Sequence, residues 1–435
     1  MSSSWVWRSS GERRRRSDMS RIVAVDVAVC LYSNRDRRSY RRTTRKSMTY
    51  AGNRRIIDVD SHLFELDDFL TAVASDDERV LLRPMDEQDE LPVSLEAIAK
   101  GRQHLERRNA DGEVMAKFEA GMFDISRSPW SRLGAFDPAD RSHALDVLGF
   151  EAQLVFSTFS FHQIAHQADP KALEVGARVH NRAMGRFCAD DHRLLAGGYV
   201  PLSLGPEVAG ELLDEAFADG CFTVMVDTNE ADPEARSFTH PDFDPVWARF
   251  AARDVPVILH IAVNGHYDPV SPSFKNNGRG ATAVGGDAPD SNLGLVAMNN
   301  SVALFLSAMI LDEVFERHDG LRVLSLEHGA SWVPGWLHKL DFVERTTRRV
   351  APRDRLASDV ARERIRFAPF AGEPVGWIME QLGPEMLCFA SDYPHPEGSR
   401  DPIGKFEATM EDVSQADLDA FFAGTIEAFL GSSVT

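Results

Sequence analysis

The sequence predicts an α/β fold, a distorted (β/α)8 TIM barrel, from three observations. Short apolar runs of four to eight residues recur from Arg54 onwards, and stretches with helical periodicity separate them. Continuous apolar runs are typical of parallel strands that are covered on both faces. Eight such strand and helix units favour a closed barrel over an open doubly wound sheet, and no GxGxxG loop follows the first strand.

The predicted strands follow one another in regular order along the chain. They are Arg55–Asp60, Ala152–Thr158, Leu194–Pro201, Phe222–Asp227, Val255–Ile261, Leu321–Glu327, Ile365–Phe370 and Met386–Ser391. Helical periodicity between them predicts Asp137–Leu148, Pro170–Ala189, Pro206–Ala218, Asp242–Ala252, Val296–Arg317, Val333–Arg349, Glu373–Leu382 and Gln415–Leu430. The first of these helices opens with Asp-Pro, which is an N-cap followed by proline at the first helical position.

Two stretches are longer than ordinary barrel loops, and both predict lid-like insertions. They are 67–136 after strand one and 263–295 after strand five, the second rich in Gly and Asn. Residues 51–435 are therefore expected to form a single barrel domain. Residues 1–50 are expected to be a disordered tail, or to precede the true start of the protein near Met48.

The balance of charged residues also changes near residue 50. Residues 1–50 hold 13 Lys and Arg against 4 Asp and Glu, whereas residues 51–435 hold 35 against 63, a net charge of −28. Phosphate contacts need clustered cations, so the acidic part argues against nucleic-acid binding. The small molecule that the barrel acts on is the expected partner. Whether the protein forms a homodimer is left open, because nothing in the sequence shows one.

The apolar runs and the cysteines bear on the compartment. The longest leader-like apolar run, Ile22–Tyr32, has 11 residues and is broken by Asp26, which is too short for a membrane span. The four cysteines are widely spaced and form no CxxC motif. We therefore expect a reduced protein in the cytoplasm, without a membrane anchor.

The polar residues that end the predicted strands form a pattern. Strand one ends in Asp60 and His62, strand five in His260, strand six in His328 and strand eight in Asp392. Reacting residues of a (β/α)8 barrel lie at these ends, and residues i and i+2 of a strand share a face. Each residue alone has an ordinary structural explanation, such as a core histidine or a capping carboxylate. Together they match the ligands of a catalytic divalent metal.

Four segments around these residues resemble the amidohydrolase superfamily, and more closely its amidohydrolase-2 branch, which includes aminocarboxymuconate-semialdehyde decarboxylase. They read IIDVDSHLFE (56–65), PVILH (256–260), SLEHGASWVPGW (325–336) and FASDYPHPEG (389–398). The resemblance spans roughly 54–430, and SDYPHPEG is its most specific motif. It implies a barrel enzyme that binds a divalent metal.

The resemblance also implies roles for individual residues. His328 would be the catalytic or second-sphere histidine, and the metal ligands would be Asp60, His62, His260 and Asp392. The superfamily commonly has His-x-His where this chain has Asp-Ser-His, and strand four supplies no Lys to bridge two ions. One ion is therefore implied. Zn²⁺ is the first expectation and Mn²⁺ the second, because the donor set contains additional oxygen.

The implied function is hydrolysis of a small organic amide, ester or lactone, aromatic ones included, through a metal-activated water. Asp392 would touch the metal and shuttle a proton, while His328 would stabilise the oxyanion or donate a proton. The same site could instead decarboxylate an aromatic or muconate-like acid. A further alternative is a degenerate barrel that serves as a binding subunit, since Asp60 replaces the usual His.

Five further residues near the strand ends are weaker candidates. Phe159, His162, Trp332 and His395 could line the substrate pocket, and Glu65 could orient a ligand from the second sphere. All but His162 have a competing explanation: a core aromatic for Phe159 and Trp332, a helix start for His395, and a salt bridge for Glu65.

Overall fold

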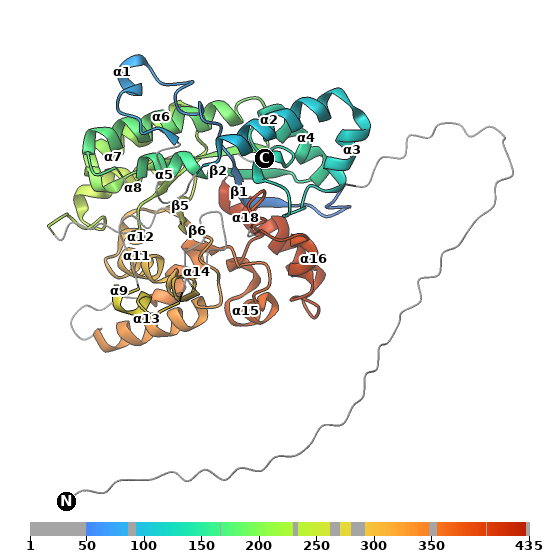
Figure 1. Cartoon of the computed structure of the whole chain (residues 1–435). Coiled ribbons are helices and arrows are strands. Elements are labelled where there is room, and N and C mark those ends of the chain that lie inside the picture. The colour runs from blue at the N-terminus through green and yellow to red at the C-terminus, as the bar shows by residue number, and fades with distance from the viewer. Residues whose placement is uncertain are drawn as a thin grey trace, which may run out of the picture. The chain divides into compact units, whose positions relative to one another are not determined.

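The structure is a computed structural model, and most of the barrel is described. The described residues are 49–85, 93–165, 167–228, 234–261, 270–279, 292–347, 355–396 and 398–431. The chain divides into the units Met1–Ser47 and Met48–Thr435, and every described residue belongs to the second (Figure 1). The expected disorder or later start of residues 1–50 stays a prediction, because all but the last two of these residues lie outside the described part.

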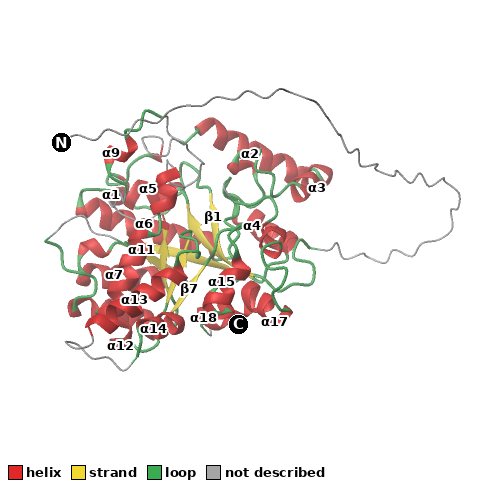
Figure 2. Cartoon of the chain, turned by 90° about the horizontal axis from the view of Figure 1, so that it is seen from below, coloured by secondary structure: helices red, strands yellow, loops and turns green. Residues whose placement is uncertain are grey.

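Seven parallel strands form one curled sheet in chain order, and helices surround it (Figure 2). The strands are β1 Ile57–Leu63, β2 Ala152–Ser157, β3 Leu194–Val200, β4 Thr223–Val226, β5 Val257–His260, β6 Val323–Leu326 and β7 Ile365–Phe367. Every strand residue except Arg366 is buried. This burial is what continuous apolar runs in a two-sided parallel sheet predict.

The eighth predicted strand closes the barrel without being a regular strand. Isolated parallel bridges join Leu387 to Phe367 of β7 and Tyr393 to Ser61 of β1. Segment 386–393 therefore links the two edges of the seven-stranded sheet. The α/β barrel is confirmed, whereas a regular strand over these residues is wrong.

A buried carboxylate explains the irregular eighth position. The side chain of Asp58 accepts hydrogen bonds from the Ser391 amide at 2.9 Å and from the Ser391 hydroxyl at 2.6 Å. The Gln153 amide donates to the same carboxylate at 2.8 Å. These side-chain bonds add to backbone hydrogen bonds between the closing segment and β1, such as that from the Asp392 amide to the Asp60 carbonyl at 2.9 Å. Burial raises the pKa of Asp58 to about 6.

The helical layer follows the prediction in part. The predicted helix Val296–Arg317 is broken at 298–299 and 312–313, and a π-helix, Ala420–Gly424, interrupts the predicted Gln415–Leu430. The helices Phe159–Ala165, Ala357–Arg364 and Pro402–Glu407 were not predicted. The helices after each strand include α4 Pro138–Leu148, α5 Phe159–Ala165, α6 Pro170–Cys188, α7 Pro206–Ala218, α8 Asp244–Arg253, α11 Asn300–Leu311, α12 Val314–Arg317, α13 Val333–Thr347, α14 Ala357–Arg364, α15 Val375–Leu382, α16 Pro402–Glu407, α17 Gln415–Asp419 and α18 Thr425–Leu430. Helix α4 begins as its sequence predicts, because the Asp137 side chain accepts the Asp140 amide at 2.9 Å. It ends at Gly149, whose φ of 73° favours glycine.

The two predicted insertions are described to different extents. The first contains α1 Asp76–Arg79, α2 Leu95–Ala110 and α3 Gly112–Ala120. A second hydrophobic cluster ties this insertion to the end of β1: Phe64, Met85, Ile98, Trp130, Ala135, Phe136 and Phe159. The second insertion is described only at α9 Pro272–Lys275 and at the start of α10 Asn292–Ala297. A lid role for either insertion stays a prediction.

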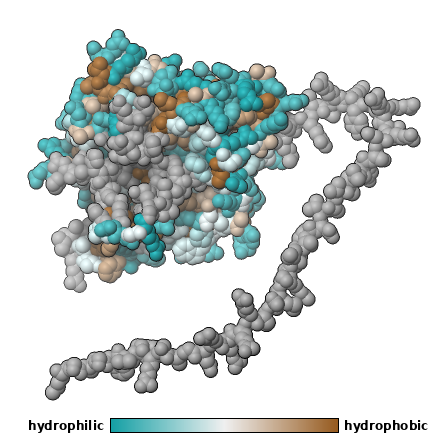
Figure 3. Space-filling model, in the orientation of Figure 1, coloured by the Kyte–Doolittle hydropathy of each residue, from teal (hydrophilic) through white to brown (hydrophobic). Residues whose placement is uncertain are grey.

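One stretch of the described chain, Asn292–Leu311, is long and apolar enough to cross a membrane by length and composition. Its inward side chains, among them Phe305, Leu306 and Met309, are buried in the barrel core. A core helix meets the same criteria, so the stretch is weak evidence for a membrane span. Among the residues that Figure 3 colours by hydropathy, hydrophilic ones predominate and hydrophobic ones are scattered between them.

Candidate metal centre

Four side chains from three strands meet at the carboxyl end of the barrel. Asp60 and His62 lie on β1, His260 ends β5, and Glu327 directly follows β6. Nε2 of His62 lies 3.3 Å and Nε2 of His260 lies 3.4 Å from Oδ1 of Asp60. Oε2 of Glu327 lies 3.6 Å from Nε2 of His260. One donor atom from each residue lies within 4.8 Å of all the others, so the four could hold one metal ion.

Asp392 and His395 complete the group from the segment that closes the barrel. Oδ1 of Asp392 lies 3.7 Å from Nε2 of His62 and 2.9 Å from Nδ1 of His395. Donor atoms of His62, Glu327, Asp392 and His395 also lie within 4.8 Å of one another. The structure thus brings together the four predicted ligands and adds Glu327 and His395 beside them.

The hydrogen bonds of His62 test whether a metal fits these residues. Nδ1 of His62 lies 3.3 Å from the Ser157 carbonyl oxygen, which can only accept, so this nitrogen carries the proton. Nε2 then presents a lone pair to carboxylate oxygens at 3.3 and 3.7 Å. A nitrogen lone pair and a carboxylate oxygen that face one another repel unless a proton or a cation lies between them. Ligand atoms of one tetrahedral ion are about 3.3 Å apart, so the spacing fits.

Asp60 shows the same need for a cation. Both of its carboxylate oxygens are buried, and neither has a hydrogen-bond donor among the described residues. Burial would raise the pKa of Asp60, and only positive charge on the facing His260 and His62 imidazoles lowers this pKa well below its usual range. A buried, ionised carboxylate requires compensation by a charge or a metal. The structure therefore supports a single divalent metal centre.

Backbone strain accompanies two members of the group. Glu327 and Asp392 both have a φ of 55°, in the left-handed region that non-glycine residues rarely adopt. Strain of this kind collects at functional sites. It also explains why the sequence analysis missed Glu327. Strand alternation would turn Glu327 and His328 to opposite faces, but the left-handed turn ends the alternation at Glu327.

His328 is buried beside the ligand group rather than within it. Nδ1 of His328 lies 3.1 Å from the Ser325 hydroxyl oxygen. Burial, together with the smaller effect of the His260 charge, lowers the pKa of His328 to about 3. The imidazole is therefore neutral at ordinary pH and available as a hydrogen-bond donor or acceptor. Its catalytic role stays a prediction.

His395 stands out among the predicted substrate-binding residues because it touches a ligand. Its ring stacks on the His62 ring, with centroids 3.9 Å apart. Its Nε2 lies 2.9 Å from the Thr158 hydroxyl oxygen, and that hydroxyl donates to the Leu63 carbonyl at 2.8 Å. His395 is thus fixed on both sides. It connects the metal group to the barrel wall.

The remaining predicted residues have structural contacts. Phe159 is buried and stacks on Trp130, with centroids 5.1 Å apart. The Trp332 indole donates to the carbonyl oxygens of His328 and Gly329, both at 3.1 Å. His162 belongs to α5, and its side chain lies outside the described part. Pocket roles for these three residues stay predictions.

Glu65 anchors a helix start. Its carboxylate accepts the amides of Thr158, Phe159 and Ser160 at distances between 2.8 and 3.2 Å. The Ser160 hydroxyl donates at 2.6 Å. No described contact joins the Glu65 side chain to a predicted ligand. A second-sphere role therefore works through the backbone of segment 158–160.

A small cavity adjoins the metal group. It measures about 90 Å³ and is bordered by Asp60, Glu327 and Asp392. Its apolar wall comes from the segment after β7 and from the segment that closes the barrel: Ala368, Pro369, Phe370, Ala371 and Ala390. Lys405 of α16 also lines the cavity. A ligand in this cavity would face carboxylates on one side and an apolar wall on the other.

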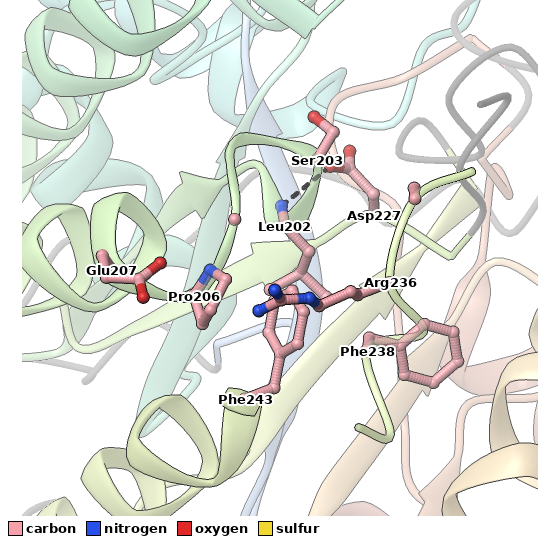
Figure 4. Close-up of a pocket in the computed structure, with 10 residues that line it drawn as sticks. Leu202, Ser203, Pro206, Glu207, Asp227, Arg236, Phe238 and Phe243 are labelled. Carbon is pink, nitrogen blue, oxygen red and sulfur yellow. Dashed lines mark hydrogen bonds between the residues drawn. The ribbon is translucent and has the colours of Figure 1, made fainter. Parts of the chain in front are cut away.

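A second pocket lies at the ends of β3 and β4 (Figure 4). It measures about 360 Å³, and its lining includes Leu202, Asp227, Arg236 and Phe243. Asp227 accepts the Tyr199 hydroxyl at 2.8 Å and the Leu202 amide at 3.1 Å. None of the predicted site residues is among those that line it.

Comparisons with solved structures agree with this architecture. An amidohydrolase from Mycobacterium avium subsp. paratuberculosis is 20% identical, with a TM-score of 0.66, and the match covers 87% of this chain and 100% of that one. A 2,6-dihydroxybenzoate decarboxylase from Rhizobium is 16% identical, with a TM-score of 0.54 and coverage of 87% and 98%. A 5-carboxyvanillate decarboxylase from Novosphingobium aromaticivorans, complexed with manganese, is 15% identical, with a TM-score of 0.56 and coverage of 87% and 96%. At these identities the likeness shows the fold.

A family comparison is more specific. No curated protein matches the chain significantly. The model of the Amidohydrolase family, however, matches residues 57–432, which include all four predicted ligands and His328. Because this match spans most of the sequence, the protein belongs to the amidohydrolase family, in its amidohydrolase-2 branch, and is a metal-dependent hydrolase or carboxy-lyase.

Proposed function

We propose that the protein hydrolyses a small organic amide, ester or lactone, aromatic ones included, by activating a water molecule. The observation that carries this proposal is the third carboxylate. Asp60, Glu327 and Asp392 surround the site together with two neutral imidazoles, so a divalent ion leaves the group with a net negative charge. An anionic substrate carboxylate would be repelled from such an ion, whereas a neutral carbonyl would not.

The ligands in this proposal are Asp60, His62, His260 and Asp392, with Glu327 as an additional oxygen donor. When bound, the ion supplies Lewis-acid chemistry, polarising a carbonyl and lowering the pKa of water. Three carboxylates move the expectation towards Mn²⁺, because oxygen donors suit that ion, although Zn²⁺ also fits two imidazoles. The manganese in the 5-carboxyvanillate decarboxylase supports this choice.

Asp392 and His395 are placed to move protons. Asp392 borders the cavity, and its Oδ1 lies 2.9 Å from Nδ1 of His395. We propose that Asp392 accepts a proton from the attacking water and that His395 holds the carboxylate in place. Neutral His328, with Nδ1 bonded to Ser325, would donate from Nε2 to the developing oxyanion.

A panel assay tests the reaction class. Purified protein, loaded with Mn²⁺ or Zn²⁺, is offered neutral amides, esters and lactones, and in parallel aromatic acids. We expect acid release from the neutral panel and no carbon dioxide from the acids. The matched variant Asp392→Asn should abolish turnover while circular dichroism shows an intact fold. Full activity after complete metal removal would contradict the proposal.

The second candidate is non-oxidative decarboxylation of an aromatic acid. Three observations favour it: several structural neighbours are described as decarboxylases, the cavity has an apolar wall, and Lys405 could hold an anion at its edge. It predicts carbon dioxide release with no product from the neutral panel. It also predicts that Glu327→Gln raises the rate, since removal of a negative charge eases binding of an anion.

We also propose a reducing compartment, the cytoplasm, for this enzyme. Cys188, Cys221 and Cys388 are buried thiols without disulfides, and burial raises the pKa of Cys188 to about 12. Thiols in this state are inert packing groups, as is usual for proteins kept reduced. Localisation of a tagged full-length chain by fractionation tests this, and an exported product would contradict it.

A further inference from the structure

Two buried arginines hold the backbone that carries the ligands. Arg132, at the end of the first insertion, donates from Nη1 to the carbonyl oxygens of Pro394 at 2.5 Å and His395 at 2.9 Å. Arg141, on α4, donates from Nη1 to the His62 carbonyl oxygen at 2.9 Å. Both side chains are at most 2% exposed. Each guanidinium thus bonds to main-chain atoms of a ligand segment.

Backbone hydrogen bonds join the two segments directly, from the Asp392 amide to the Asp60 carbonyl at 2.9 Å and from the His62 amide to the Tyr393 carbonyl at 2.7 Å. Asp392 has left-handed backbone, and segment 391–396 makes one isolated bridge, at Tyr393, rather than a ladder. On β1, the register with β2 shifts between Asp58 and Ser61, next to the ligands. Arg141 also donates from Nη2 to the Ser61 hydroxyl at 2.9 Å. The arginines therefore reinforce a junction that backbone hydrogen bonds already make between β1 and the closing segment.

Neighbouring contacts join both segments to the same short stretch of the insertion. The Tyr393 hydroxyl donates to the Leu133 carbonyl at 2.6 Å, and the Phe64 amide donates to the Ala135 carbonyl at 2.8 Å. Arg141 closes the stretch by donating to the Gly134 carbonyl at 3.2 Å. Residues 132–135 therefore contact β1 and the closing segment together.

We propose that Arg132 and Arg141 are positioning residues for the metal centre, which we call the arginine clamp. The clamp sets the spacing between the β1 ligands, Asp60 and His62, and the ligand Asp392 of the closing segment. Burying a charged guanidinium is costly unless specific bonds compensate it, so the carbonyl contacts indicate a dedicated role. The inference rests on the proposed metal centre.

Arg108 of α2 provides a matched control from the same insertion. It is also buried, at 1% exposure, but it pairs with Asp140 and donates to the Ser131 carbonyl at 3.4 Å. None of its contacts among the described residues reaches a ligand segment, and only its partner Asp140, which also accepts the Gly134 amide, touches the stretch 132–135. Loss of Arg108 should therefore destabilise the fold without changing the spacing of the ligands.

The test measures Mn²⁺ affinity by titration calorimetry on the full chain, with thermal stability in parallel. We expect Arg132→Met and Arg141→Met to weaken Mn²⁺ binding by about 10- to 100-fold, as losses of outer-sphere support do. Arg108→Met should lower the melting temperature to a similar degree and leave the Mn²⁺ affinity within about two-fold of wild type. Arg132→Lys keeps one donor and should give an intermediate affinity.

The outcomes separate the two proposals. A folded Arg132→Met variant with wild-type Mn²⁺ affinity overturns the clamp, as does an equal loss in Arg108→Met. If the Met variants do not fold, the same comparison of Mn²⁺ affinity is made between Arg132→Lys and Arg108→Lys, and the same outcomes apply. Wild-type protein that binds neither Mn²⁺ nor Zn²⁺ overturns the metal centre and the clamp with it.

Discussion

The imidazole rings of His62 and His395 stack nearly parallel, with centroids 3.9 Å and planes 16° apart. One ring belongs to a predicted ligand, and the other lies against the carboxylate of Asp392. The stack therefore joins the proposed proton-transfer pair, Asp392 and His395, to a proposed metal ligand.

The first prediction concerns this stack. His395→Phe keeps an aromatic ring against His62 but removes the nitrogen beside Asp392. We expect bound metal to stay near wild-type content, while kcat falls by about 100-fold or more, the usual contribution of a proton-transfer group. Elemental analysis and steady-state kinetics measure the two quantities. Unchanged kcat would show that His395 only packs against the site.

The second prediction concerns the third carboxylate. Glu327→Gln removes one negative oxygen donor and should weaken Mn²⁺ binding by about 10-fold or more, with a smaller effect on Zn²⁺. Competition titrations with both ions measure this selectivity. The control is Glu344→Gln, a buried carboxylate that accepts the Ala357 amide at 2.6 Å, away from the ligands. Equal losses in both variants would remove Glu327 from the centre.

The third prediction concerns pH. His180 is buried in α6 against the Ser157 hydroxyl at 2.8 Å, and burial lowers its pKa from 6.5 to about 4. Between these values the unfolded chain binds a proton that the folded chain does not. The free energy of unfolding therefore falls as the pH falls from 6.5 to 4, by up to about 3 kcal/mol from this group.

Urea unfolding of wild type and His180→Gln across this range isolates the contribution of His180. The difference in unfolding free energy between the two proteins should change with pH only between 4 and 6.5. Other buried groups titrate equally in both proteins and cancel. Parallel curves for the two proteins would contradict the assignment.

The fourth prediction concerns Glu65. Glu65→Ala leaves the buried amides of Thr158, Phe159 and Ser160 without their acceptor. An unsatisfied buried polar group costs about 1–3 kcal/mol, so the free energy of unfolding should fall by about 3 kcal/mol or more. Urea titration measures it. Glu96→Ala, an exposed change in the first turn of α2, should stay within about 0.5 kcal/mol of wild type.

Much of the site could be predicted from strand spacing alone. Asp60, His62, His260 and Asp392 end predicted parallel strands, and such ends meet at one rim of a barrel. Glu327 could not be predicted, because its left-handed backbone breaks the alternation that assigns side chains to faces. The contacts of Arg132 were equally hidden, since they depend on an insertion folding back over the barrel.

The fold, like the site, could be predicted only in part. Helix α4 could be placed from its Asp-Pro start and its terminal glycine, because both signals act over a single turn. The irregular eighth strand could not, since the apolar run 386–391 reads like any other strand. What differs is the buried Asp58 carboxylate more than 300 residues earlier, which takes the bonds of Ser391.

That seam between Asp58 and Ser391 has a consequence for how the enzyme is assembled. Asp392 is the next residue, so closing the barrel at this seam also positions a proposed metal ligand. Bound metal should then stabilise the closed form of the barrel. Amides of segment 387–393 should exchange with deuterium faster in metal-free protein than in loaded protein, while β3 and β4 exchange equally in both.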